Sequence, residues 1–429
     1  MPPALHLKSS FLAICIMGDF TGKKMAIATL GCKLNFAESS SIAQQFVRNG
    51  FAEVSPYSSG VDVCVVNTCT VTEHSDKKCR NIIRRIHKLN PDAVIAVTGC
   101  YATLKKSEIE ALEGVSFVLE QDKKGSVYSR CIELLEGSPC SPSAAEHIFP
   151  ACSFGERTRS FLKVQDGCNY FCTYCAIPYA RGRSRSVPVE TLVSQAREIA
   201  EKGVKEIVLT GVNIGDYDGG LLSVLKALND VKGIERYRIS SIEPNLLTEE
   251  MIDWIASGTK FQPHFHIPLQ SGCDSTLSRM HRKYDTALFA SRIDYIRKKM
   301  GDVFFGIDVI AGFPGETDEE FNSTLSFIRD RISPAFLHIF PYSRRKGTLA
   351  DKMDGQVPEI VKTQRVKALE ELSDKLHLDY QERFAGTRQK VLFEGRVKGN
   401  LMGGYTGNYI RVERPYDAKA IGEIVEVVI

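Results

Sequence analysis

No apolar run in this 429-residue sequence is long enough to cross a lipid bilayer as a helix. The best candidate, Phe11–Met17, follows Lys8 and is far shorter than the roughly 20 residues that a membrane-spanning helix needs. A secretory segment remains an alternative reading of this run. We expect no membrane partner, and we interpret residues 1–23 as a dispensable N-terminal extension.

A strong net charge is also absent. The formal net charge is only +3, so no global field attracts nucleic acid, and such a partner would have to be bound by local basic patches. The sequence shows no P-loop, no dinucleotide-binding fingerprint and no strong Ser/His/Asp triad. None of these chemistries therefore competes with the one that the cysteines indicate.

Cysteine is abundant, but its pattern does not suit disulfides. The chain has 13 cysteines, an odd number in a large protein, which fits metal-bound thiols in a reducing cytoplasm better than a disulfide framework. Cys168, Cys172 and Cys175 form a CxxxCxxC loop with no fourth cysteine close behind. A [4Fe-4S] cluster normally takes four thiolates, so three would leave one iron open to a small molecule. The alternative is a structural zinc loop, although zinc usually takes four ligands in paired CxxC halves.

The region 24–125 predicts a parallel α/β sheet with three cysteines at one edge. Short apolar strands alternate with helical stretches, and a cysteine follows each of three strands. The carboxyl ends of parallel strands share one edge, so these thiols are expected to converge and hold a second cluster. Alternatively, any of them is an ordinary buried core residue. The strands are Lys24–Leu30, Val61–Val66 and Ala93–Val97, and the cysteines that follow them are Cys32, Cys69 and Cys100.

After a linker at 126–154, residues 155–386 predict a partial (βα) barrel. The cysteine loop follows the first expected strand, and active sites of such barrels lie at the carboxyl ends of the strands. Strand ends also carry Thr210–Asn213, Ser241–Pro244 and Gly312–Glu316. The expected strands are Ser160–Val164, Glu206–Leu209, Tyr237–Ser240, Val303–Ile310 and Ala335–Phe340.

The tail, residues 387–429, is rich in β signals and predicts a small β-barrel. Strands are expected at Lys390–Phe393, Tyr409–Val412 and Ile424–Ile429, with glycine pairs between them. Basic and aromatic side chains suit RNA binding, and a barrel used only for protein contacts is the alternative. A basic helical face formed by Lys77, Arg80, Arg84 and Lys88, and the run Arg181–Arg185, are further candidates for phosphate contact or for ordinary solvated surface.

These motifs together resemble the methylthiotransferases of the radical S-adenosylmethionine (SAM) superfamily. The resemblance covers nearly all of the chain after residue 24. It implies an N-terminal methylthiotransferase domain, a radical SAM domain and a C-terminal TRAM domain. Beyond the cysteines it rests on Thr29–Asn35, Asn67–Val71, His266–Cys273, Met280–Tyr284 and Phe340–Ser343.

The resemblance also implies roles for individual residues. Cys168, Cys172 and Cys175 would hold the radical SAM [4Fe-4S] cluster, and Cys32, Cys69 and Cys100 a second, auxiliary one. Contacts to SAM are expected from Tyr174, Gly211, Glu243 and Phe340. For each of the last three there is a plain alternative, such as a simple turn for Gly211 or a surface carboxylate for Glu243.

The implied reaction is transfer of a methylthio group to an inert C–H carbon, which needs cofactor-borne radical chemistry. Gly31–Asn35 looks most like the branch acting on threonylcarbamoyladenosine at position 37 of ANN-decoding tRNAs, the MtaB-type branch. That carboxylate-bearing substrate would favour a cationic pocket, for which Arg183, Arg185, Arg344, Arg345 and Lys346 are candidates. An electron donor and a sulfur source are also implied, and no DNA partner is expected.

Three alternatives remain open at this point. The substrate could be isopentenyladenosine in tRNA, or the acceptor could be a ribosomal protein. The third alternative is a non-catalytic RNA-binding protein with structural clusters.

Overall fold

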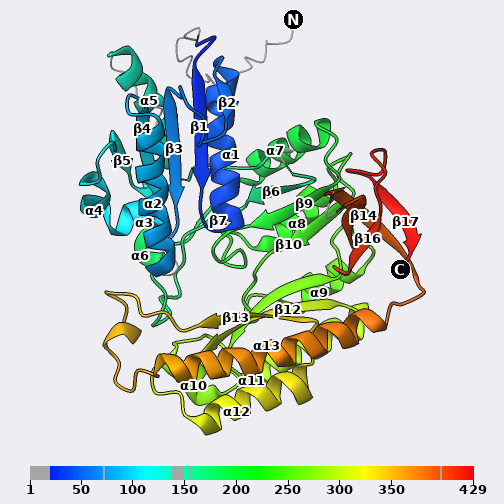
Figure 1. Cartoon of the computed structure of the whole chain (residues 1–429). Helices are drawn as coiled ribbons and strands as arrows, with labels where there is room; N and C mark the ends of the chain where they lie inside the picture. Colours follow the sequence, from blue (N-terminus) through cyan, green and yellow to red (C-terminus); the bar gives the residue numbers. More distant parts are fainter. Residues whose placement is uncertain (1–19, 71–72, 138–147, 155–156, 397–398) are drawn as a thin grey trace, which may run out of the picture.

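The computed structural model of the chain describes residues 20–70, 73–137, 148–154, 157–396 and 399–429. Most of the predicted extension 1–23 lies outside these residues. The α/β fold class is confirmed: a parallel sheet stands at one end of the molecule, a partial barrel lies against it, and a small antiparallel sheet packs at the side (Figure 1). No helix within the described ranges is both long and apolar enough to cross a membrane.

The N-terminal sheet is fully parallel, with strand order β2-β1-β3-β4-β5. Helices pack on both of its faces, and its strand β3 is buried throughout, as expected for the centre of such a sheet. The elements are β1 Lys24–Thr29, α1 Lys33–Arg48, β2 Ala52–Val54, β3 Val63–Thr68, α2 Glu73–Leu89, β4 Val94–Gly99, α3 Cys100–Leu104, α4 Lys106–Glu110, β5 Phe117–Leu119, η1 Gln121–Ser126 and α5 Val127–Glu136.

Helix α5 lies inside the stretch that the sequence predicts as a linker. Val127, Cys131 and Ile132 on one face of α5 are buried against the N-terminal sheet. These apolar side chains make the helix part of that core, so the chain leaves the first sheet only after residue 136. The stretch 138–147 lies outside the described residues.

The barrel consists of six parallel strands in two sheets, β10-β9-β6 and β11-β12-β13, joined by a parallel bridge between Ser241 and His266. Five of the strands match the predicted ones. The sixth, β11, was missed because Pro268 interrupts its pattern, and its pairing with β12 shifts register there. The elements are β6 Arg159–Lys163, β7 Gln165–Asp166, α6 Ile177–Arg181, β8 Arg185–Ser186, α7 Val189–Glu201, β9 Glu206–Thr210, α8 Leu221–Asn229, β10 Arg236–Ile239, α9 Glu249–Ala256, β11 His264–Gln270, α10 Asp274–Arg279, α11 Thr286–Met300, β12 Phe304–Ala311, α12 Asp318–Ser326, η2 Phe327–Ile332, β13 Phe336–Pro341 and η3 Ala350–Lys352.

A 24-residue helix, α13 (Glu359–Glu382), runs along the barrel and leads into the C-terminal sheet (Figure 1). That sheet is antiparallel, with order β16-β15-β14-β17. Two local predictions differ from it. Gly403 and Gly404 lie within a strand, and Tyr409 precedes β16 because its φ of 62° belongs to a turn. The strands are β14 Arg388–Arg396, β15 Leu401–Thr406, β16 Arg411–Pro415 and β17 Ile424–Val428.

Candidate functional site

The three cysteines of the N-terminal sheet, here called the auxiliary triad, lie together at its carboxyl edge. Cys32 begins the turn into α1, Cys69 follows β3, and Cys100 opens α3 directly after β4. An ideal Cβ on Gly31 would lie 2.8 Å from the Sγ of Cys69. Cys32 is near enough to Cys100 to influence its ionisation. The topology therefore brings together three thiols separated by 68 residues of chain from first to last.

Glycine is required before two of these cysteines. Gly31 and Gly99 have φ values of 105° and 103°, a region that side-chain-bearing residues rarely adopt. At Gly99 an added Cβ would lie 2.3 Å from the carbonyl oxygen of Thr68. These glycines let the sheet edge close tightly around the auxiliary triad.

Cys168, Cys172 and Cys175, here called the loop triad, lie in the turn that follows the first barrel strand and β7. Gln165 shapes this turn by donating to the carbonyl of Gly167 (2.8 Å) while accepting from the backbone N–H of Asn213 (2.9 Å). Burial raises the pKa of Cys168 to about 11 and that of Cys175 to about 12. Free thiols at Cys168 and Cys175 would be protonated at neutral pH, so a bound cation is what would hold these two as thiolates.

Arg282 links the loop triad to a predicted SAM contact. Its guanidinium donates to the Sγ of Cys172 (3.2 Å) and the hydroxyl of Tyr174 (3.3 Å), and it forms an ion pair with Glu243. Burial raises the pKa of Glu243, while Arg282 opposes that shift. Sequence reasoning did not single out Arg282, although it lies in the quoted motif Met280–Tyr284.

A cavity of about 610 Å³, here called the loop cavity, opens beside the loop triad. Tyr174, Cys175 and Phe340 line it, and so does Thr70, the residue after Cys69 of the auxiliary triad. Phe340 is 47% exposed, so its ring is available to a ligand. Of the other predicted SAM contacts, Gly211 lines a different cavity, described below, and Glu243 is held by Arg282.

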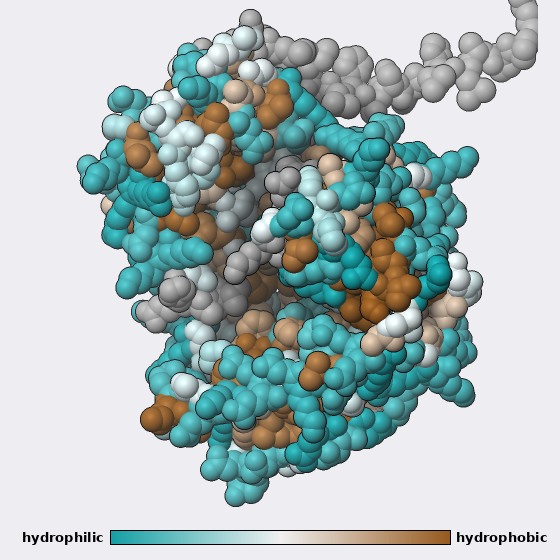
Figure 2. Space-filling view, turned by 45° about the vertical axis from the view of Figure 1, so that its right-hand side comes forward, coloured by the Kyte–Doolittle hydropathy of each residue, from teal (hydrophilic) through white to brown (hydrophobic). Residues whose placement is uncertain are grey.

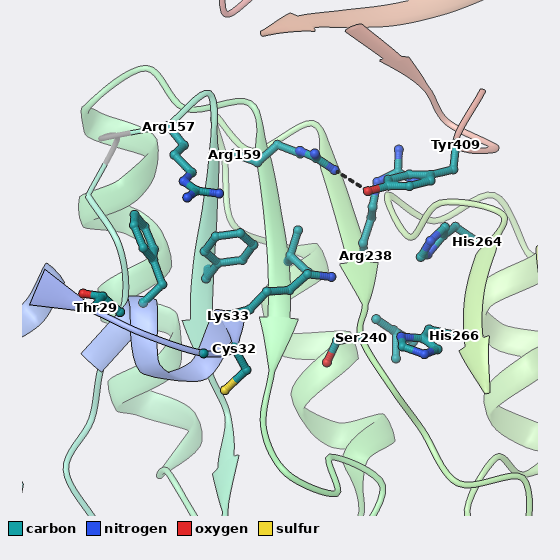
Figure 3. A pocket seen from close by; sticks show the side chains of 15 residues that line it. Thr29, Cys32, Lys33, Arg157, Arg159, Arg238, Ser240, His264, His266 and Tyr409 are labelled. Carbon is teal, nitrogen blue, oxygen red and sulfur yellow. Dashed lines mark hydrogen bonds between the residues drawn. The ribbon is translucent and has the colours of Figure 1, made fainter. Parts of the chain in front are cut away.

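Two further cavities meet at Cys32 and Lys33. The cationic cavity, about 280 Å³, is lined by Lys33, Arg157, Arg159 and Arg238 among others (Figure 3). The lumen cavity, about 630 Å³, continues into the barrel past Gly211 and His338 to Arg411 of the C-terminal sheet. Seen from outside, the molecule is hollowed between the N-terminal sheet and the barrel (Figure 2). Residues shared by the two cavities are Gly31, Cys32, Lys33, Ser240, His264, His266 and Tyr409.

A fully buried ionic network joins the two cysteine sites. Glu38 on α1 accepts from Lys124 (2.5 Å), Lys163 (2.7 Å) and Arg181 (3.1 Å). Asp166 also pairs with Lys163 and Arg181. Three cations face two carboxylates, and Arg181 and Lys124 lower the pKa of Cys100, although burial raises it overall. The network therefore leaves positive charge beside the auxiliary triad, which suits an anionic cluster.

Of the network only Arg181 was named from the sequence, and Lys33 was not singled out as a site residue; three of the candidate cations named from sequence are engaged with other groups, and two of these, Arg344 and Arg345, line the loop cavity. Arg345 pairs with Asp76, Arg344 pairs with Asp351, and Arg185 donates to the carbonyl of Arg181. In the basic face of α2, Arg80 is paired with Glu108. No local signal in the sequence could have told which cations are neutralised by distant carboxylates.

Comparison with known proteins agrees with this architecture. Residues 162–328 match the radical SAM superfamily, and residues 24–120 match the Uncharacterized protein family UPF0004. The chain is 40% identical to a threonylcarbamoyladenosine tRNA methylthiotransferase MtaB of Bacillus subtilis, over 94% of this chain and 93% of that protein. It is 37% identical to the MtaB protein of Aquifex aeolicus, over 95% and 100%.

The chain belongs to the MtaB-type methylthiotransferase family. It is accordingly a radical SAM transferase, as the resemblance predicted. A tRNA-2-methylthio-N(6)-dimethylallyladenosine synthase of Carboxydothermus hydrogenoformans is 34% identical, over 88% of this chain and 89% of that one. Among solved structures, the radical SAM methyltransferase TsrM of Kitasatospora setae shares the fold at TM-score 0.59 and 12% identity, over 89% of this chain and 80% of that chain.

The donor sets suit the cofactors that this superfamily uses. Each triad sets three cysteines at one sheet edge or in one loop, and each has a cation beside it: Arg282 at the loop triad, and Arg181 and Lys124 at the auxiliary triad. Iron–sulfur clusters take thiolate ligands, and an anionic cluster is stabilised by nearby positive charge. SAM and iron–sulfur chemistry therefore fit the residues present.

Proposed function

We propose that this protein transfers a methylthio group to C2 of N6-threonylcarbamoyladenosine at position 37 of ANN-decoding tRNAs in the cytoplasm. It would do so with two [4Fe-4S] clusters, one on each cysteine triad, and with SAM, an electron donor and a sulfur source. The observation that carries the proposal is the loop cavity, because it is bordered by Cys175 of one triad and by Thr70 beside Cys69 of the other.

The full-length similarity to MtaB proteins supports the substrate assignment. The isopentenyladenosine alternative has weaker support, since relatives named for that type of substrate are 34% and 30% identical. The residue after Cys32 is Lys33, part of the Gly31–Asn35 motif on which the branch resemblance rests. Its side chain lines the cationic cavity.

Bound at the two triads, the clusters and SAM would supply the radical that removes hydrogen from carbon and the sulfur that replaces it. The chain's own residues position these groups. Arg282 fixes Cys172, Tyr174 and Glu243 relative to one another. Phe340 offers an aromatic face to a ring in the loop cavity. The buried network around Glu38 holds the two cysteine sites in fixed relation.

Nucleoside mass spectrometry tests the substrate. tRNA from a strain lacking the gene should lack 2-methylthio-threonylcarbamoyladenosine, and the intact chain should restore it. Cys172→Ala and Cys69→Ala should each fail to restore it. If the tRNA profile is unchanged by the deletion, the tRNA proposal is wrong and ribosomal proteins become the place to look.

Iron counting tests the number of clusters. Anaerobically reconstituted protein should hold about eight iron atoms per chain, the content of two [4Fe-4S] clusters. The Cys172→Ala and Cys69→Ala variants should each lose about half. A full complement in either variant would refute the assignment of that triad.

A further inference from the structure

Within the cationic cavity, Lys33 has no hydrogen-bond or ion-pair partner among the described residues. It follows Cys32 directly and extends from the start of α1 toward the barrel strands (Figure 3). Its side chain is open to the cavity, and its charged neighbours include Arg159, Arg238 and Asp308. Of these, Asp308 already forms a 2.6 Å contact with the Nε2 of His266.

The other cations of this wall are mostly neutralised. Arg238 pairs with Glu206 (2.7 Å) and donates to the carbonyls of Thr406 and Gly407. Arg159 pairs with Glu394 at 2.6 Å. Arg157 has no carboxylate partner in the described part of the chain, and its guanidinium lies 4.5 Å from the ring centroid of Phe36. Lys33 and Arg157 are thus two cations that line one small space and have no carboxylate partner among the described residues.

This cavity is built to take an anion next to flat rings. Tyr409 and His264 both line it, with ring centroids 4.6 Å apart, and Tyr405 of the adjoining lumen cavity lies 4.7 Å from Tyr409. A carboxylate on a flexible arm, attached to an aromatic base, matches cations at one side and ring faces at the other.

The chemistry of the proposed substrate places its carboxylate near the sulfur donor. In adenine, the reacting carbon C2 and the carbon that bears the N6 substituent are both bonded to N1. The carboxylate at the end of the N6 substituent therefore lies within one arm's length of C2, and a residue next to the auxiliary triad is within reach of it. Lys33 meets this condition because it adjoins Cys32.

We propose that Lys33, assisted by Arg157, binds the carboxylate of the threonylcarbamoyl group in the cationic cavity and so determines specificity for that substituent. This inference rests on the proposed function. It differs from the sequence-based candidates Arg344 and Arg345, which the structure pairs with Asp351 and Asp76.

Binding to a modified anticodon stem-loop provides the test. Full-length reconstituted protein is titrated, by fluorescence anisotropy, into a stem-loop carrying threonylcarbamoyladenosine and into the same stem-loop with the carboxylate blocked as its methyl ester. The intact protein should prefer the free carboxylate by about tenfold or more, the range of a charge-assisted hydrogen bond. Lys33→Gln should bind the two equally, and Lys33→Arg should keep most of the preference.

Controls separate this role from folding and from general charge. Lys367→Gln removes an exposed lysine of α13 and should leave the preference intact. Iron content and visible absorbance show whether Lys33→Gln preserves the neighbouring cysteine site. If iron content or absorbance falls in Lys33→Gln, the Arg157→Gln variant tests the carboxylate site instead. It should reduce the preference for the free carboxylate without changing the auxiliary triad. In turnover, Lys33→Gln should raise KM for the natural substrate about tenfold with kcat within about twofold.

Two outcomes would overturn the inference, and they differ from failure of the proposed function. An iron-replete Lys33→Gln protein that still prefers the free carboxylate would show that other groups bind it. An intact enzyme that methylthiolates the modified tRNA but binds ester and acid equally would show that no carboxylate subsite exists. Absence of any methylthiolation by the intact enzyme would instead refute the proposed function itself.

Discussion

Single glycines decide whether the auxiliary triad can assemble. Because a Cβ on Gly31 would lie 2.7 Å from the Cβ and 2.8 Å from the Sγ of Cys69, Gly31→Ala should displace that thiol. We expect reconstituted Gly31→Ala protein to lose about half of its iron. The matched control is Gly22→Ala, which has a similar φ of 92° but nothing within 4 Å of the added Cβ. Full iron content in Gly31→Ala would contradict the proposed ligand set.

Arg282 is expected to tune the loop-triad cluster. Hydrogen bonds and positive charge at a ligating sulfur favour the reduced form of an iron–sulfur cluster. Arg282→Gln, which removes the charge beside Cys172, should therefore shift the midpoint potential to more negative values, measured by redox titration with electron paramagnetic resonance. Arg279→Gln is the control, because that arginine pairs with Glu320 and donates to no cysteine in the described residues. An unchanged potential in Arg282→Gln would argue against this role.

At the scale of secondary structure, ion pairs as well as apolar packing hold five elements together. These are α1, η1, β6, β7 and α6. Removing the charge of Glu38 would leave Lys163 and Arg181 facing Asp166 only, and Lys124 with the side-chain oxygen of Asn67 but no carboxylate. Glu38→Gln should cost about 3–5 kcal/mol of unfolding free energy, the usual cost of breaking a buried ion pair. Urea unfolding measures it, and adding Lys163→Met should recover part of the loss. Additive losses in the double variant would be inconsistent with this coupling.

The same network predicts sensitivity to acid. Burial alone would raise the pKa of both carboxyls, but Arg181 and the lysines outweigh it, holding the pKa of Glu38 well below its usual range and that of Asp166 at about 2. A carboxyl with a depressed pKa stabilises the fold above its unfolded pKa, and this stability is lost as pH falls toward the folded value. Unfolding free energy should therefore drop between about pH 5 and about pH 2, less steeply in Glu38→Gln.

At the scale of the whole molecule, the features that could be predicted are those that a recurring local pattern marks in the sequence. Strand-then-cysteine patterns predicted the edge where Cys32, Cys69 and Cys100 gather, and five of the six barrel strands were visible as apolar runs. Strand β11 was hidden by Pro268, and β15 by Gly403 and Gly404. An added Cβ on Gly404 would lie 2.5 Å from the carbonyl oxygen of Leu392, so glycine is part of that strand's packing.

Charge partners could not be predicted, because they join residues far apart in the chain. Glu38 and Lys163 are separated by 125 positions, and Asp76 and Arg345 by 269. Lys33 lies within the motif Thr29–Asn35. That it has no carboxylate partner among the described residues becomes evident only in the folded structure, where the barrel and Tyr409 close the cavity around it. The proposed ligand cysteines could thus be named from the sequence, whereas the charge environment around Lys33 and Arg282 could not.

Arg238 is predicted to dock the C-terminal sheet onto the barrel, and so to complete the cavity at Lys33. It is buried, pairs with Glu206 of β9, and donates to the carbonyls of Thr406 (2.7 Å) and Gly407 (2.8 Å). Arg238→Met should leave those carbonyls unpaired and loosen the sheet, so that protease cleaves more rapidly between α13 and β14. Arg388→Met, which removes an exposed arginine of β14, should be cleaved at the intact rate. Equal cleavage of both variants would mean that the sheet is held by apolar packing, whereas selective cleavage of Arg238→Met with weakened stem-loop binding would show that the substrate cavity depends on docking.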